Sequence, residues 1–317
     1  MTQPTAPETD TEAANPTDPS EGGPASAPPR PPRRPSARPR PDRRRWIGEK
    51  LIPLGILGIV LFCLAPFYWM VVSSLRRSSD IFDTTPLPGP VSFENYVAVV
   101  DPELGFGRAL FNSLFVAGVT TVIALFIAVL TAYAISRLKF RFKRLILTTI
   151  MATSMFPVVS IVVPLLNLFA EIRWINTYQA LIVPNLSFAL PLAVWILTAF
   201  FRQMPVALEQ AAMVDGCTRW QAFRMVILPL AAPGIMTTAI LTFIAAWNEF
   251  LIALTMTNDM DMQTAPVALS RFTGASEFET PFGTQMAAGV LVTIPLVILV
   301  LVFQRRIVDG LTSGAVK

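Results

Sequence analysis

The chain has 317 residues, of which 53% are hydrophobic, a formal net charge of +4 and no histidine. The lack of histidine removes the commonest general base and the commonest metal ligand in proteins. No Gly-x-x-x-x-Gly-Lys-Ser/Thr segment occurs, so we expect the chain to bind neither ATP nor any other cofactor. The basic residues lie in an N-terminal tail and beside long apolar runs, which indicates membrane topology and argues against nucleic-acid binding.

Residues 1–45 form a Pro/Arg-rich tail that we expect to be disordered, because it holds twelve of the 28 prolines and shows no apolar periodicity. Its second half, from Arg30 to Arg45, is either a solvated segment that enforces orientation or a contact for anionic lipid head groups. The apolar run that follows is too long for a signal peptide. It ends in Arg76 and Arg77 and lacks a small-residue cleavage site.

The rest of the chain, residues 46–317, is predicted to be one all-α membrane domain with six transmembrane helices. About 20 apolar residues are needed to cross the hydrocarbon layer, and several runs reach that length. The predicted spans are residues 51–75, 111–135, 145–170, 180–201, 235–256 and 285–308. Cys63 falls in a span and Cys217 in a loop, so no structural disulfide is expected.

The distribution of lysine and arginine predicts the orientation of these spans. The tail, the two loops after the second and fourth spans, and the C-terminus together carry 20 of the 25 basic residues. The segments on the other side carry five. Because basic residues collect on the cytoplasmic side, both termini are predicted to be cytoplasmic.

Two sequence features bear on how the spans pack. Small residues recur every four positions in the second span, at Thr120, Ala124, Ala128, Ala132 and Ser136. Such a face permits close approach of another helix, either in this chain or in a partner subunit. Prolines at positions 157, 164, 191 and 295 permit kinks, which either line a cavity or only shape the packing.

The loop at residues 202–234, between the fourth and fifth spans, is predicted to form two short helices joined by a turn. Pro205 suits a first helical position, and Gly216 can adopt the left-handed conformation that ends a helix. Thr218 and Gln221 match a capping box that begins the second helix, and Pro229 closes it. Its apolar side chains need burial, in lipid or in a groove on another protein; they are Trp220, Phe223, Met225, Val226 and Ile227.

This loop resembles the cytoplasmic EAA loop of permease subunits in bacterial ATP-binding-cassette importers. In that family Glu-Ala-Ala is followed by three residues, Gly, nine residues and Ile-x-Leu-Pro. The matching positions here are Ala211, Ala212, Gly216, Leu228 and Pro229. Val226 replaces the family isoleucine, which is a conservative change.

The family glutamate aligns with Gln210, and Glu209 lies one position earlier. An acidic contact with the ATPase is therefore either lost or moved by about 100° around the helix. The ATPase-coupling residues that the resemblance implies are Glu209, Gln210, Ala211, Ala212, Asp215, Gly216, Leu228 and Pro229.

Further segments are similar to the sugar-importer branch of this family, among them Trp247-Asn248-Glu249-Phe250 and residues 215–223. The likeness covers roughly residues 51–317 and is greatest to the smaller permeases of maltose- and trehalose-type systems. It implies the type I importer permease fold in the bacterial cytoplasmic membrane, with alternating access and no bond chemistry. The implied partners are two cassette ATPases that bind ATP and Mg²⁺, a second and different permease, an extracytoplasmic sugar-binding protein and membrane lipid.

Glu249 is the one ionisable residue predicted to lie well inside a span, and intramembrane charges suggest function. Asn248 beside it could bind a hydroxyl-rich ligand. The pair either contacts sugar or braces helices at an outer gate. The external loop, residues 257–282, carries Asp259 and Asp261 and is the predicted contact for the binding protein, with a plain solvated loop as the alternative.

Two other functions remain open on the residues alone. An ion-coupled secondary transporter would use Glu249 as its proton or cation site and would work without an ATPase. A membrane scaffold would use the loop to bind another partner and would transport nothing. Neither explains the spacing of Ala211, Ala212, Gly216, Leu228 and Pro229.

Overall fold

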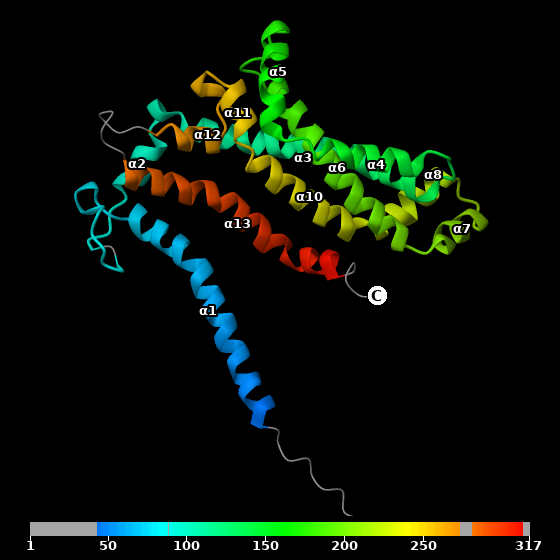
Figure 1. Cartoon of the computed structure of the whole chain (residues 1–317), viewed down its shortest axis with the longest axis horizontal. Coiled ribbons are helices and arrows are strands. Elements are labelled where there is room, and N and C mark those ends of the chain that lie inside the picture. Colours follow the sequence, from blue (N-terminus) through cyan, green and yellow to red (C-terminus); the bar gives the residue numbers. More distant parts are fainter. Residues whose placement is uncertain (1–42, 88, 273–280, 313–317) are drawn as a thin grey trace, which may run out of the picture. The chain divides into compact units, whose positions relative to one another are not determined.

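The computed structural model describes residues 43–87, 89–272 and 281–312, and it divides into two units, residues 1–56 and 57–317 (Figure 1). The predicted disordered tail lies outside the described residues up to position 42. All regular secondary structure in the described part of the chain is helical. The α-helices are α1 Arg43–Ser74, α2 Glu94–Val100, α3 Phe106–Arg137, α4 Lys143–Thr153, α5 Val158–Glu171, α6 Tyr178–Gln203, α7 Val206–Val214, α8 Arg219–Ala222, α9 Leu228–Leu230, α10 Ala232–Trp247, α11 Leu251–Met256, α12 Ala265–Ser270 and α13 Phe282–Thr312.

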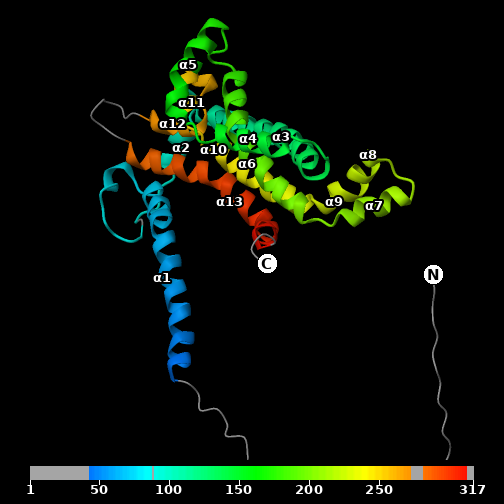
Figure 2. The same cartoon turned by 45° about the vertical axis from the view of Figure 1, so that its right-hand side comes forward.

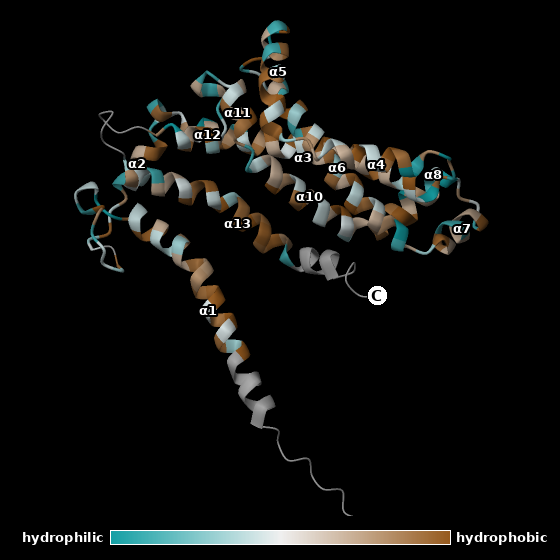
Figure 3. Cartoon of the chain, viewed as in Figure 1, coloured by the Kyte–Doolittle hydropathy of each residue, from teal (hydrophilic) through white to brown (hydrophobic). Residues whose placement is uncertain are grey.

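Four of these helices are long and apolar enough to cross a membrane, within α1, α3, α6 and α13. Two bent pairs, α4 with α5 and α8–α9 with α10, would raise the number to six if each is one span. Figure 3 shows hydrophobic residues running along the long helices, while hydrophilic residues collect around α8. The described chain is thus a multi-pass membrane protein.

The centre of the second unit is the packing of α3 against α6 and α10. The small residues of α3 lie in this interface: Thr120, Ala124, Ala128 and Ala132 are fully buried. Ala128 and Ala132 share a core with Ala193 of α6. The small-residue face therefore packs within this chain, which was one of the two predicted outcomes.

The third predicted span is bent by 86° between α4 and α5. Pro157 is the N-cap of α5, and it cannot donate the backbone hydrogen bond that would continue α4. The predicted kink at this proline is therefore confirmed.

The fifth predicted span, residues 235–256, is not one helix: α10 ends at Trp247 and α11 starts at Leu251. The apolar run also extends further back than predicted, because α10 begins at Ala232 after a bend of 69° from the segment Arg219–Leu230. Hydropathy marks apolar runs, but it does not detect side chains that cap a helix.

The short helices of this unit gather at its two ends. In both views α2, α11 and α12 lie near one end of α3, and α7, α8 and α9 lie at the other (Figures 1 and 2). The two loops singled out in the sequence are therefore at opposite ends of the helices, as an external loop and a coupling loop would be.

Candidate functional site

The loop between α6 and α10 has the predicted helix–turn–helix form. The helix α7 begins at Val206, one position later than predicted, so Pro205 is its N-cap and not its first helical residue. Gly216 has a φ of +93°, the left-handed value expected at the end of the helix. Its N–H donates to Met213, and the N–H of Cys217 donates to Ala212, so the helix ends in a Schellman motif.

The second helix begins at the predicted capping box. The Thr218 hydroxyl accepts from the Gln221 N–H, and the Gln221 side chain accepts from the Thr218 N–H. Pro229 does not close the helix, contrary to prediction. A π-helical turn, Phe223–Ile227, precedes it, and the Leu228 N–H donates to the carbonyl of Phe223. This wider turn lets the helix continue through Pro229 to Leu230.

The predicted apolar strip divides into an exposed part and a buried part. Phe223 and Ile227 lie in the core with α3 and α6. Trp220 and Met225 are 60% and 67% exposed, and Val214 is 87% exposed. The described part of the chain leaves these three apolar side chains uncovered.

Most polar and small residues of the matched motif are exposed as well. Gln210, Ala211, Asp215, Gly216 and Pro229 are exposed. Ala212 is buried, and Leu228 is partly buried. The exposed members are accessible to another subunit, and the others hold the loop on its own chain.

Glu209 turns away from the exposed surface. Its carboxylate accepts a hydrogen bond of 2.8 Å from the Tyr133 hydroxyl and lies 3.6 Å from Nε of Arg137. The side chains of Arg137 and Glu209 are 6% and 9% exposed. The charge next to Gln210 is thus paired within the chain, and α7 presents an uncharged amide at the family glutamate position.

Asn248 and Glu249 lie in the break between α10 and α11. The Glu249 carboxylate accepts from the backbone N–H groups of Ile252 and Ala253, at 2.7 and 3.0 Å. Asn248 is exposed, and its amide donates to the carbonyl of Ile244. Glu249 therefore caps α11 from a helix break, which suits the bracing alternative, and the sequence reading missed this break.

The loop that follows α11, which the sequence predicts to be external, is anchored to α3 and α6 by a buried amide. The fully buried Asn112 donates to the carbonyls of Asp261 and Gln263, at 2.8 and 2.9 Å. Its carbonyl oxygen accepts from the Tyr178 hydroxyl at 2.8 Å. The Ser113 hydroxyl next to it accepts from the Ala265 N–H.

The described acidic residues of this loop are exposed. The side chains of Asp259 and Asp261 are both exposed, while backbone groups of both residues form hydrogen bonds with asparagine side chains. The side chain of Asn176 accepts from the N–H groups of Asn258 and Asp259. Asp259 and Asp261 are thereby presented at fixed positions, and residues 273–280 of the loop lie outside the described range.

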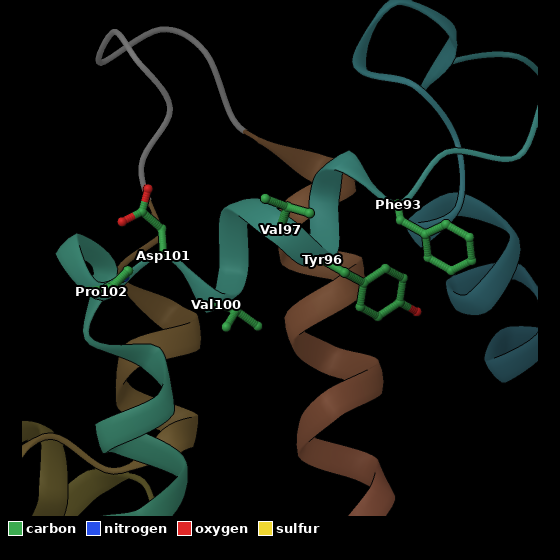
Figure 4. Close-up of a pocket in the computed structure, with 6 residues that line it drawn as sticks. All are labelled: Phe93, Tyr96, Val97, Val100, Asp101 and Pro102. Carbon is green, nitrogen blue, oxygen red and sulfur yellow. The ribbon is translucent and has the colours of Figure 1, made fainter.

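A shallow groove of about 620 Å³ beside α2 was not predicted from the sequence (Figure 4). Phe93, Val97 and Val100 line it with exposed apolar side chains, and Asp101 lies at its end. The buried residues of α2, Asn95 and Val99, face away from this side. In residues 93–100 the buried and exposed positions alternate with the period of a helix that lies on a surface. The apolar lining is unsuited to a polyhydroxylated ligand.

Two more grooves lie beside the bend between α4 and α5, with volumes of about 530 and 350 Å³. They share Thr153 and Ser187, and the second also contains Thr131 and Thr149. These hydroxyls are the polar groups of largely apolar walls. The sequence reading singled out none of them.

Comparison with known proteins assigns the family. Residues 98–313 match the model of the binding-protein-dependent transport system inner membrane component. The trehalose transport system permease protein SugB of Mycobacterium tuberculosis is 48% identical over 82% of this chain and 94% of its own length. The trehalose/maltose transport system permease protein MalG of Thermococcus litoralis is 42% identical over 87% of this chain and 99% of its own.

A solved structure shares the fold. In a bacterial ABC transporter involved in the import of the acidic polysaccharide alginate, one chain superposes with a TM-score of 0.73 at 21% identity. The match covers 84% of this chain and 99% of that one. The chain belongs to the family of inner-membrane permease components of binding-protein-dependent transport systems.

Proposed function

We propose that this chain is a transmembrane subunit of an ATP-driven importer for a carbohydrate, an oligosaccharide or glycoside. The observation that carries the proposal is the loop at residues 202–234. It holds the exposed apolar side chains of Val214, Trp220 and Met225 on a capped helix–turn–helix at one end of the bundle. Exposed apolar side chains on short helices suit a groove on a cassette ATPase, in the helix-in-groove manner.

The proposed topology has six spans with both termini in the cytoplasm. Each bent pair counts as one span, and the 20 basic residues on one side support the orientation. This places the α7–α8 loop in the cytoplasm and the Asn112-anchored loop outside. The exposed Asp259 and Asp261 would then meet the sugar-loaded binding protein.

The relatives support the class of solute. SugB and MalG are named for trehalose and maltose transport, and a sulfoquinovosyl glycerol permease of Agrobacterium fabrum is 39% identical over 80% of this chain. The solutes in all three protein names are glycosides. A second permease is part of the proposal, because α1 leaves the apolar side chains of Leu57, Phe62 and Phe67 uncovered for lipid or another subunit.

Glu249 fits the importer better than an ion-coupled carrier. Both of its carboxylate oxygens accept backbone N–H groups of α11, so they are committed to holding the helix break together. With Asn248, we assign it to the translocation path as a bracing or gate residue. A cation site would need further oxygen ligands around it.

The partners provide a direct test. The tagged chain would be purified from its native membranes in mild detergent, and the co-purifying proteins would be identified by mass spectrometry. The proposal predicts a cassette ATPase and a second permease in stoichiometric amounts. Recovery of the folded chain alone would contradict it and would favour the secondary transporter.

A further inference from the structure

The exposed motif explains how the loop could bind an ATPase, but it does not explain how movement of the loop reaches the spans. Covalently, the loop is connected to α6 and α10. The non-covalent contacts add a third connection, to the end of α3. Because α3 packs along both α6 and α10, a contact with α3 reaches the centre of the unit.

This contact consists of Tyr133, Arg137 and Glu209. Tyr133 and Arg137 are four positions apart on α3 and therefore lie on one face of its last turns. Tyr133 donates to the Glu209 carboxylate, and Arg137 faces the same carboxylate through Nε. A second nitrogen of Arg137 donates to the carbonyl of Met204, just before α7, at 3.0 Å. The two side chains thus hold both the start and the first turn of α7.

The packing around these groups covers the Arg137 and Glu209 side chains and adds a second attachment. The Tyr133 ring lies 4.4 Å from the ring of Phe223, at the start of the π-helical turn, and 6.2 Å from that of Phe201 in α6. Inside such a shell an ion pair is screened little, and loss of one partner leaves a buried charge uncompensated. One tyrosine therefore contacts α7, the π-helical turn and α6 together.

The Glu209 side chain is buried although its neighbours on the loop are exposed. Gln210, Asp215 and Gly216 are all exposed. A carboxylate serving only solubility or an intersubunit ion pair would lie on that side. Its burial against two residues of α3 shows that this position of α7 serves contact within the chain.

We propose that Tyr133, Arg137 and Glu209 form a clamp that transmits movement of the coupling loop to α3. This rests on the proposed function of the loop as an ATPase contact. The three are positioning residues: they bind no sugar and no nucleotide. The clamp makes α7 move as one body with the end of α3, so that a displacement of the loop changes the packing of α3 against α6 and α10.

The test uses the complete transporter complex in proteoliposomes with the Tyr133→Phe, Arg137→Gln and Glu209→Gln variants. Tyr133→Phe keeps the ring packing and removes one hydroxyl. Tyr68→Phe is its matched control, because it also removes a single hydroxyl, from α1. Arg141→Gln is the control for Arg137→Gln, because it removes one positive charge from an exposed position near the same helix end.

Two quantities are measured: the ATP hydrolysed per sugar imported, and hydrogen exchange of the backbone amides in residues 206–216. We expect about tenfold faster exchange in Tyr133→Phe, the factor that accompanies loss of one hydrogen bond to a charged group. We also expect a several-fold rise in ATP hydrolysed per sugar. The Glu209→Gln and Arg137→Gln effects should be non-additive in the double variant, because both break the same pair. The controls should match the wild type in both quantities.

The outcomes separate the clamp from the function on which it rests. Absence of ATP-driven uptake in the wild-type complex would overturn the proposed function, while the exchange data would still test the contact. Normal exchange in Tyr133→Phe would overturn the clamp itself. Faster exchange with an unchanged ratio of ATP to sugar would overturn its coupling role and leave a purely structural contact.

Discussion

Two carboxylates that the sequence marks as candidate functional groups make contacts within the chain. Glu249 looks like an intramembrane charge in the sequence, yet it caps the broken end of α11 with both oxygens. Glu209 looks like a displaced contact for another subunit, yet it is buried against Tyr133 and Arg137. In both cases a carboxylate satisfies groups that the apolar surroundings would otherwise leave unpaired.

Replacing Glu249 by Gln should impair transport without changing its energy source. The neutral amide accepts backbone N–H groups more weakly than a carboxylate, so the α10–α11 break should loosen. We expect a several-fold lower uptake rate that still requires ATP and is insensitive to ionophores. If wild-type uptake depended on an ion gradient and uptake by the variant did not, the result would contradict the capping role and support the secondary transporter.

Replacing Gly216 by Val should uncouple ATP hydrolysis from uptake while the protein still inserts and assembles. Its φ of +93° costs a β-branched residue about 1–2 kcal/mol, whereas no neighbouring atom lies within 4 Å of an added Cβ. The defect is therefore conformational, and Gly216→Asn, which tolerates left-handed backbone, should be milder. Wild-type uptake by Gly216→Val would count against the turn's role in docking.

At the scale of helices and loops, the sequence was sufficient for features with a local physical cause. The left-handed Gly216, the capping box of Thr218 and Gln221, and the break at Pro157 each depend on neighbouring residues only. The π-helical turn before Pro229 was not predicted, and the anchoring of the loop after α11 by Asn112 depends on residues far away in the chain. The 149-residue separation between Asn112 and Asp261 leaves no local pattern to read.

The external loop should lose its fixed position when Asn112 is replaced by Ala. Two backbone carbonyls of the loop would lose their donor, at about 1–3 kcal/mol per buried group left unsatisfied. We expect faster hydrogen exchange in residues 258–265 and a loss of the stimulation of ATPase activity by the binding protein. Tyr178→Phe, which removes one hydrogen bond to Asn112, should have a smaller effect in the same direction. Unchanged stimulation in both variants would sink the anchoring role.

The contact between α6 and α10 should be intolerant of a single added methyl group at Gly234. A Cβ at this position would lie 2.6 Å from the ring of Phe200, so the helices would have to move apart. Gly234→Ala should lower the free energy of unfolding by about 1–3 kcal/mol, measured as a reduced Tm in detergent. Gly118→Ala in α3 is the matched control, since nothing lies within 4 Å of its Cβ. Equal Tm values for the two variants would contradict close packing at Gly234.

For the whole molecule, charge and hydropathy predicted the class of protein but not the course of every span. The four membrane-length helices and the bend at Pro157 follow from the sequence, whereas the 69° bend before α10 was not predicted. The position of the α7–α9 loop and of the α11–α12 loop at opposite ends of α3 was inferred from loop alternation and is seen in both views (Figures 1 and 2). Neither the sequence nor the fold identifies the transported solute, because the grooves beside the α4–α5 bend have largely apolar linings.

The most direct test of the account is uptake by the purified complex, reconstituted in liposomes with its binding protein and supplied with radiolabelled trehalose, maltose or related glycosides. We expect accumulation that requires ATP on the side of the α7–α8 loop, stops when the ATPase is inhibited and persists when ion gradients are collapsed. Accumulation driven by an ion gradient without ATP, or no accumulation of any glycoside that the binding protein retains, would contradict it.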